Sequence, residues 1–246
     1  MWDDAKQLDA IAKALTLASV ALLLWAMTAW AARQSPFEFR EIVVRGSLAH
    51  VDSVQLETAI RRELSGTFFT MNLDEALSTL TKLPWVRNVA LRRQWPQRLE
   101  VTVEEHVPFG RWNDTALVDT FGGVFTAEYD GALPQFSGPR ERAAEVADRY
   151  REAQAALAPL GLEIEAVRLS ARGGWQITAK GTAGRIALDL GRDEPAARLE
   201  HFVAVYERTI GTLARAGTRI EHVDLRYRNG FAARVPGFRE RVRKKV

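Results

Sequence analysis

Few residues of this sequence have the type and spacing that catalysis or metal binding needs. The sequence contains four histidines without a partner at HxxxH or HxH spacing, namely His50, His106, His201 and His222. Because cysteine is also absent, we expect no zinc site and no cysteine nucleophile. Neither a G-x-S-x-G nucleophile elbow nor a G-x-x-x-x-G-K-S/T phosphate loop occurs in the sequence.

A pair of adjacent carboxylates is the remaining candidate for acid–base chemistry. Glu104 and Glu105 lie in a segment with the alternation of a β-strand, in which neighbouring side chains point to opposite faces. The two carboxylates therefore do not converge on one substrate, although a pair assembled from distant segments stays open. We expect a protein that is not an enzyme and that holds neither a cofactor nor a metal.

The net charge is concentrated at the end of the chain. The formal charge is +3, but residues 237–246 contain five basic residues and one acidic residue, so the rest of the chain has a net charge of −1. The composition is 47% hydrophobic and 26% charged, which excludes a wholly disordered chain. The basic tail has two interpretations, a solubilising end and a contact with anionic lipid.

Residues 14–32 form an uncharged run of 19 residues between Lys13 and Arg33. A helix of this length spans roughly 28 Å, which is close to the hydrocarbon thickness of a bilayer. Trp25 and Trp30 lie in its second half, where an interfacial aromatic belt would hold them. An uncleaved transmembrane anchor explains the length better than a signal peptide or a buried core helix. The flanking charges do not fix the orientation of this segment.

Residues 37–107 have the pattern of a β-α-α-β-β unit. In the last strand, apolar side chains occupy the odd positions from Leu99 to Val103. We expect Trp85 and Trp95 to pack in the core or at a hairpin. The expected elements are a strand at 37–46, a helix from Asp52 or Ser53 to Leu64, a helix from Asn72 or Asp74 to Pro84, and strands at 86–94 and 98–107.

Residues 108–236 alternate short strands with helices. Glycines at Gly122–Gly123 and Asn229–Gly230 favour turns between strands. The sequence as a whole predicts an α+β protein with an N-terminal transmembrane helix and two soluble units, the second with an antiparallel sheet. The elements expected in the second unit are strands at 116–119 and 124–126, an extended stretch at 133–136, a helix at 139–159, strands at 164–170, 174–179 and 185–190, one helix with a face from Leu199 to Leu213, and strands at 219–226 and 231–235.

Two sets of segments carry a resemblance to one family. FxFREIVVRG, PWVRNVALRRQWP and RLEVTVEEHVP together are similar to a POTRA domain. LSARGGWQITAKG, LDLGRDEPAARLEHFVAVY and IEHVDLRYRNGFAARV follow in the order of the β domain of the FtsQ/DivIB family. The chain therefore resembles this family of bacterial division proteins along nearly its whole length. The implied parts are a cytoplasmic segment at 1–13, a transmembrane helix at 14–32, a POTRA domain at 37–107, a β domain at 108–236 and a basic tail at 237–246.

The resemblance implies a non-catalytic, single-pass type II protein of the cell inner membrane, located at the division septum with most of the chain in the periplasm. It implies binding to FtsB in its complex with FtsL, and a link between early and late divisome proteins that controls septum assembly. A nucleic-acid partner is not expected, because the basic tail lies outside the cytoplasm. The alternative is a POTRA-bearing translocation or outer-membrane assembly factor, which usually carries a β-barrel after several POTRA repeats.

The resemblance places partner binding at the end of the second unit, where FtsB is expected to add a strand to the sheet edge at 231–235. Tyr227 is the expected hot spot, because its ring buries a large area yet keeps a polar end. The alternative is that Leu225 and Tyr227 are ordinary core residues. The expected contacts are Leu225, Arg226, Tyr227, Arg228, Asn229, Gly230 and Phe231, with Arg172 and Trp175 from an earlier strand.

A second contact surface is expected on residues 86–95 of the POTRA domain. A short sheet has free edges, and free edges favour strand addition. We expect the outward side chains of Arg87, Asn88 and Arg92 to take part in recruitment to the division site. The alternative is that this strand contributes only core residues.

Overall fold

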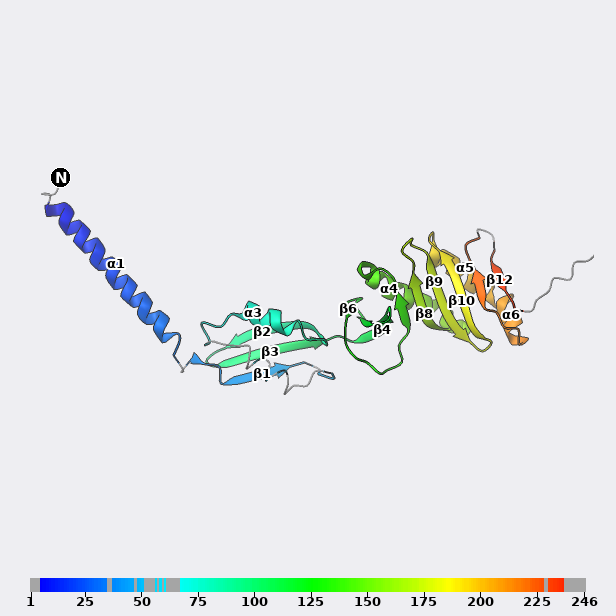
Figure 1. Cartoon of the computed structure of the whole chain (residues 1–246), viewed down its shortest axis with the longest axis horizontal. Helices are drawn as coiled ribbons and strands as arrows, with labels where there is room; N and C mark the ends of the chain where they lie inside the picture. The colour runs from blue at the N-terminus through cyan, green and yellow to red at the C-terminus, as the bar shows by residue number, and fades with distance from the viewer. Residues whose placement is uncertain are drawn as a thin grey trace, which may run out of the picture. The chain divides into compact units, whose positions relative to one another are not determined.

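The computed structural model describes residues 5–34, 37–46, 48–50, 56, 58, 60, 67–227 and 230–236 (Figure 1). The chain divides into two compact units, Met1–Glu105 and His106–Val246. Four of the expectations above fall partly or wholly outside the described residues. They concern the first four residues, both ends of the helix expected at 52–64, the Arg228–Asn229 pair and the basic tail.

Helix α1 (Ala5–Ala31) contains the expected membrane segment except its last residue, Ala32, and extends it toward the N-terminus. Its 24 residues from Leu8 to Ala31 are long and apolar enough to cross a membrane. Within this stretch, the Thr16 and Thr28 hydroxyls donate to backbone carbonyls of the preceding turn, at 2.8 and 2.9 Å. These bonds satisfy the polar side chains inside the helix, as a hydrocarbon environment requires.

The rest of the first unit is a three-stranded sheet with helical residues packed on it (Figure 1). The strand order is β1-β3-β2, with β1 parallel and β2 antiparallel to β3. Leu99 and Val103 are buried as expected, and Leu56 and Ile60, both helical, share their core. The described elements are β1 (Glu41–Arg45), α3 (Leu73–Leu80), β2 (Val86–Gln94) and β3 (Arg98–Glu105).

The expected start of α3 is confirmed at Asn72. Its side-chain oxygen accepts hydrogen bonds from the backbone amides of Asp74 and Glu75. Its expected end is wrong: α3 stops at Leu80, where the Thr81 hydroxyl donates to the last carbonyls, and not at Pro84. The strand expected at 37–46 is also shorter, because only its second half pairs with β3.

The second unit contains one nine-stranded sheet in the order β12-β11-β10-β9-β8-β7-β4-β5-β6. Strand β12 therefore forms one end of the sheet. The strands are β4 (Pro108–Trp112), β5 (Ala116–Asp119), β6 (Val124–Phe125), β7 (Gln135–Ser137), β8 (Glu163–Leu169), β9 (Trp175–Gly181), β10 (Gly184–Gly191), β11 (His222–Asp224) and β12 (Ala232–Arg234).

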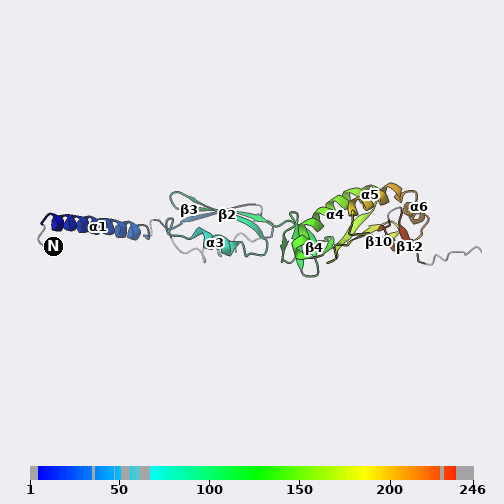
Figure 2. The same ribbon diagram turned by 90° about the horizontal axis from the view of Figure 1, so that it is seen from above.

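Helices α4 (Ala143–Leu157) and α5 (Pro195–Tyr206) lie on one side of this sheet (Figure 2). Their apolar faces close a core in which Phe136, Ile177 and Phe202 are fully buried. The other face of the sheet bears polar side chains of β8 to β10, among them Arg168, Gln176 and Asp189. Helices α4 and α5 leave this face uncovered, and among the described residues no strand pairs with the outer side of β12.

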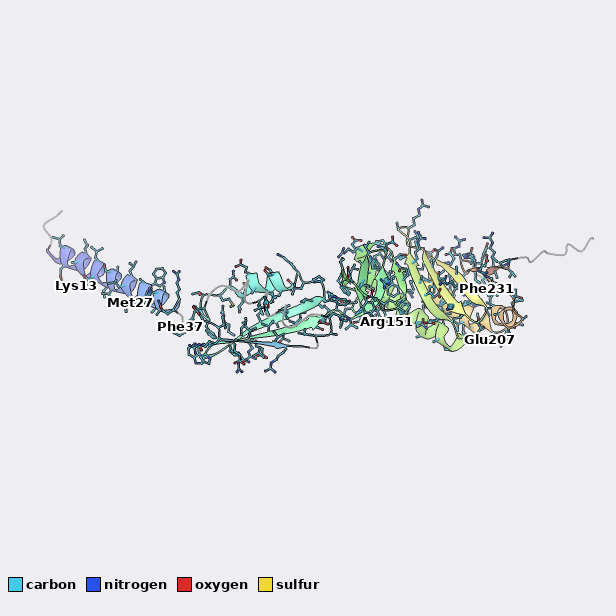
Figure 3. All side chains as sticks on the ribbon, turned by 60° about the horizontal axis from the view of Figure 1, so that its bottom comes forward. Lys13, Met27, Phe37, Arg151, Glu207 and Phe231 are labelled. Carbon is cyan, nitrogen blue, oxygen red and sulfur yellow. The ribbon has the colours of Figure 1, made fainter. Side chains whose placement is uncertain are left out.

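Two expectations for the second unit are wrong in detail, and one strand was not predicted. The single helix expected through Leu213 breaks after Tyr206, and α6 (Ile210–Arg215) follows a turn that contains Glu207 (Figure 3). Leu213 is consequently exposed and does not join the core. Strand β4 was not expected, because Pro108 and Gly110 interrupt the strand pattern.

The structure explains the glycine in β4 and the short length of β11. A Cβ on Gly110 would lie 2.4 Å from the ring of Phe136, so only glycine fits there. The strand expected at 219–226 shrinks to β11, because the side chain of Asp224 accepts the amide of Arg226 at 3.0 Å and turns the chain out of the ladder.

A candidate partner-binding edge

Strand β12 is the exposed end of the large sheet, as the sequence predicted for residues 231–235. It pairs antiparallel with β11 through the register Val223 opposite Ala233, and all three of its residues are exposed. Within the described part of the chain, its other side has no neighbouring strand. Such an edge presents main-chain donors and acceptors to an incoming extended segment.

Tyr227 lies in the connection from β11 to β12, with 60% of its surface exposed. It lines a surface hollow of about 470 Å³ together with Leu225, Gly230 and residues at the start of α5, among them Glu194 and His201. The alternative that Tyr227 is a core residue is therefore wrong. For Leu225 it is right, because only 3% of Leu225 is exposed.

Phe231, the residue before β12, connects the edge strand to the core. Its ring meets the ring of Phe202 at 6.0 Å in an edge-to-face arrangement, so α5 holds the start of β12 (Figure 3). The expected contact set thus separates into two roles. Leu225 and Phe231 anchor the segment to the core, and Tyr227 and Gly230 line the hollow, of which Leu225 forms the buried part.

Arg226 is engaged by carboxylates of its own chain. Its guanidinium donates to both Asp224 oxygens, at 2.7 and 2.9 Å, and lies 3.8 Å from Asp189 on β10. The hydrogen bond from Arg226 holds the pKa of the Asp224 carboxyl below its ordinary value, and the same pair raises the pKa of Arg226. The pair fixes the direction in which the chain leaves β11.

Arg172 and Trp175 differ in their exposure to solvent. Trp175 is buried, with the Arg149 guanidinium 5.5 Å from the centroid of its ring, so its side chain offers little surface to a partner. Arg172 is exposed on the turn before β9 and lines a hollow of about 540 Å³ with Arg226. The structure therefore brings Arg172 and Arg226 together on the open side of the sheet.

Two further arginines in this hollow, Arg168 and Arg192, were not expected from the sequence. The signal for Arg168 was present, because the alternation of β8 points it away from the buried Val167 and Leu169. No local pattern indicated Arg192, which joins the hollow through the turn after β10.

The first unit also presents an edge strand. Strand β2 is at one end of the small sheet, with Asn88 and Arg92 exposed. Arg87 was expected to point outward, but it is half-buried and donates to Glu104 at 2.7 Å. A register shift between Val86 and Asn88 turns this part of the strand.

The carboxylates singled out above have structural partners. Glu105 accepts the backbone amides of Ala49 and His50 at 3.0–3.2 Å, whereas Glu104 pairs with Arg87. Asp119, which is 1% exposed, contacts His106 at 2.7 Å and accepts amides of its own turn. Among the described residues, no group of three or more histidines and carboxylates is placed to hold a metal ion.

These features define a class: a POTRA domain preceded by an apolar helix of membrane-spanning length and followed by a sheet-rich α/β domain. Residues 37–106 match the protein family described as "POTRA domain, FtsQ-type". Residues 110–226 match the family described as "Cell division protein FtsQ/DivIB, C-terminal".

Relatives of full length show the same relationship. The chain is 37% identical over 240 residues to the cell division protein FtsQ of Nitrosospira multiformis, which covers 95% of this chain and 99% of that protein. It is 36% identical over 243 residues to FtsQ of Burkholderia pseudomallei, and this alignment covers 97% of this chain and 96% of that protein. It is 34% identical over 256 residues to FtsQ of Bordetella pertussis, with 94% of this chain and 92% of that protein covered. The chain therefore belongs to the FtsQ/DivIB family of cell division proteins.

The Asp224–Arg226 pair gives the first testable expectation. In an Arg226→Gln variant, the pKa of the Asp224 carboxyl rises toward its ordinary value of about 3.9, because the guanidinium that stabilises the carboxylate is gone. The lowered pKa stabilises the folded state above that ordinary value, and this contribution disappears as the pH falls through the folded-state pKa. The difference in stability between the parent chain and the variant is therefore present at neutral pH and absent in acid.

The measurement is a carboxyl NMR titration of the full chain with labelled aspartate, combined with urea unfolding at several pH values. The control is Arg185→Gln, which removes an ion pair with Glu165 on the same face of the sheet and should leave the Asp224 titration unchanged. An Asp224 pKa that is the same with and without Arg226 would contradict the role given to this pair.

Proposed function

We propose that this protein is a non-catalytic, single-pass component of the divisome that binds FtsB, in complex with FtsL, along the β12 edge. In this role it links early and late division proteins and controls septum assembly. The observation that carries the proposal is the exposed three-residue edge strand beside an exposed tyrosine, Tyr227. Membership of the cell division family supports the cellular role.

Strand addition suits the geometry of this edge. An extended segment of FtsB would continue the sheet beyond β12, and main-chain hydrogen bonds would supply affinity. Side chains of the added strand would alternate between the two faces of the sheet. The hollow beside Tyr227 includes Gly230, two residues before β12, and the ring of Tyr227 is available to cover an apolar side chain of the partner there.

Charge supports an acidic partner segment. Arg226 is already paired with Asp224, but Arg168 and Arg172 form no ion pair with the described carboxylates. A partner carboxylate near the edge would thus find Arg172 unengaged and Arg226 held in a fixed position. Arg228 lies outside the described residues, and its part in this contact remains a proposal from the sequence.

The location follows from the same proposal. Helix α1 anchors the chain in the cell inner membrane as a type II single-pass protein, and both soluble units lie in the periplasm at the division septum. The apolar stretch of α1 supports the anchor. The orientation rests on the family, since the flanking charges do not decide it.

Replacing Tyr227 by alanine tests the interface directly. We expect FtsB binding to weaken about tenfold or more, which corresponds to about 1.4 kcal/mol, because a central aromatic anchor is lost. The free energy of unfolding should change by less than about 0.5 kcal/mol, because the side chain is exposed. Binding by titration calorimetry and unfolding by urea are both measured on the full chain.

The matched control is Phe121→Ala, since Phe121 is a similarly exposed aromatic residue of the same unit, 65% exposed, on the turn after β5. This variant should bind FtsB like the parent chain. If Tyr227→Ala loses binding only in proportion to lost stability, or not at all, the interface does not include Tyr227.

For the POTRA domain, we propose that the outer side of β2 contributes to recruitment to the division site. Combined alanine substitution of Asn88 and Arg92, which are exposed on β2, should reduce septal localisation of a fluorescent fusion, while the thermal midpoint stays within a few degrees. The same experiment with Ser78 and Lys82, both exposed at α3, is the control. Undiminished septal signal in the Asn88 and Arg92 variant would place recruitment elsewhere.

A further inference from the structure

A cluster of aromatic rings gathers at the end of the POTRA domain that carries the β2–β3 turn. Phe69 and Trp95 are 53% and 67% exposed, and they are the two exposed large hydrophobic residues among the described residues of this unit outside α1. Their ring centroids lie 6.4 Å apart. We call the whole group the aromatic end, and its members are Phe37, Phe39, Phe68, Phe69 and Trp95.

The rings of the aromatic end are held in place by neighbouring rings. The Phe69 ring contacts those of Phe37 and Phe68, each at 5.2 Å, and Phe68 contacts Trp95 at 5.6 Å. All three of these contacts are edge-to-face, a favourable geometry for aromatic pairs. The exposed area is therefore ordered and adjoining rather than scattered, which is typical of an interaction surface.

The backbone fixes the same group. The amide of Phe68 donates to the Phe37 carbonyl at 2.7 Å, and the Arg40 amide donates to the Gln97 carbonyl at 2.9 Å. The first bond joins the 67–70 turn to the segment that enters the domain (Phe37 is labelled in Figure 3), and the second joins that segment to the β2–β3 turn. Three stretches of the chain thus present their rings at one end of the domain.

The membrane helix brings this end close to the bilayer. Only five residues, 32–36, separate Ala31, the last residue of α1, from Phe37, and the six steps between them span at most about 22 Å when extended. In addition, the Thr67 hydroxyl donates to the carbonyl of Ala32, one residue beyond α1. The rings next to Thr67 therefore lie within reach of the headgroup layer in which α1 ends.

We propose that the aromatic end is a membrane-contact surface, whose occupant is the headgroup layer of the bilayer that α1 spans. Trp95 and Phe69 match this layer chemically, because aromatic rings concentrate at the boundary between headgroups and hydrocarbon. Arg33 and Arg40 are exposed in the connecting segment and are placed to pair with lipid phosphates. The contact orients the POTRA domain on the membrane and does not depend on FtsB binding.

A protein partner or a second copy of the chain is the competing occupant for such a surface. The short connection favours lipid, because the bilayer is the one surface that α1 keeps permanently beside these rings. The test therefore uses purified chain in vesicles without division partners.

The absence of cysteine in the natural sequence makes a site-specific test direct. Single variants Phe69→Cys and Trp95→Cys each carry a nitroxide label on the full chain, in vesicles of phosphatidylethanolamine and phosphatidylglycerol. Asn88→Cys is the matched control, because it is exposed on β2 and lies about 23 Å along the strand from Trp95. Collision rates with oxygen, which concentrates in lipid, and with a water-soluble nickel complex are measured for each label.

We expect the oxygen-to-nickel collision ratio to be several-fold higher at positions 69 and 95 than at position 88. Two labels guard against the loss of one ring, since each variant keeps the other. Equal ratios at the three positions would overturn the proposal. Dipolar broadening between labels on two chains, or shielding of the labels only after partner proteins are added, would also overturn it and assign the surface to protein contacts.

Discussion

Main-chain hydrogen bonding along the outer side of β12 is the interaction on which the proposed function depends. A sheet that ends in an exposed strand leaves donors and acceptors to water, and an added strand replaces water with fixed partners. Strand β12 has three residues, so an edge this short is a weak template for unspecific pairing. Specificity must then come from the side chains beside the edge, which are Tyr227 on one side and the arginines of the open sheet face on the other.

The core of the second unit makes this edge possible. Val223 and Leu225 are buried in the same core as Phe202 of α5, and Phe202 contacts Phe231, so both flanks of the connection from β11 to β12 are anchored. Helices α4 and α5 cover a single face of the sheet (Figure 2), and polar side chains such as Arg168, Gln176 and Asp189 occupy the other face. The POTRA domain repeats the arrangement on a smaller scale, with β2 as its edge and α3 packed against the sheet core.

The fold was predictable from the sequence where polar and apolar side chains alternate along a strand or where a side chain caps a helix. The bounds of β2 agree with the prediction, and Asn72 was a correct start for α3. The predictions failed where tertiary packing or one side-chain hydrogen bond overrides a local pattern. Gly110 is typical of a strand interruption by sequence alone. In the structure it lies within β4, because the Phe136 ring occupies the space that a Cβ would need. At the candidate site, alternation put Leu225 and Tyr227 on one strand face. The strand instead ends at Asp224, whose side chain accepts the amide of Arg226, so Leu225 is buried and Tyr227 is exposed.

Amide hydrogen exchange on the full chain, with and without the FtsB–FtsL complex, tests the central claim most directly. Strand addition slows exchange only where new main-chain bonds form or an existing ladder becomes less able to open. We expect slower exchange in peptides that contain β12, with the sheet end at β6 unchanged. Exchange in β12 that stays the same while the complex is bound would contradict the claim that this edge holds the partner.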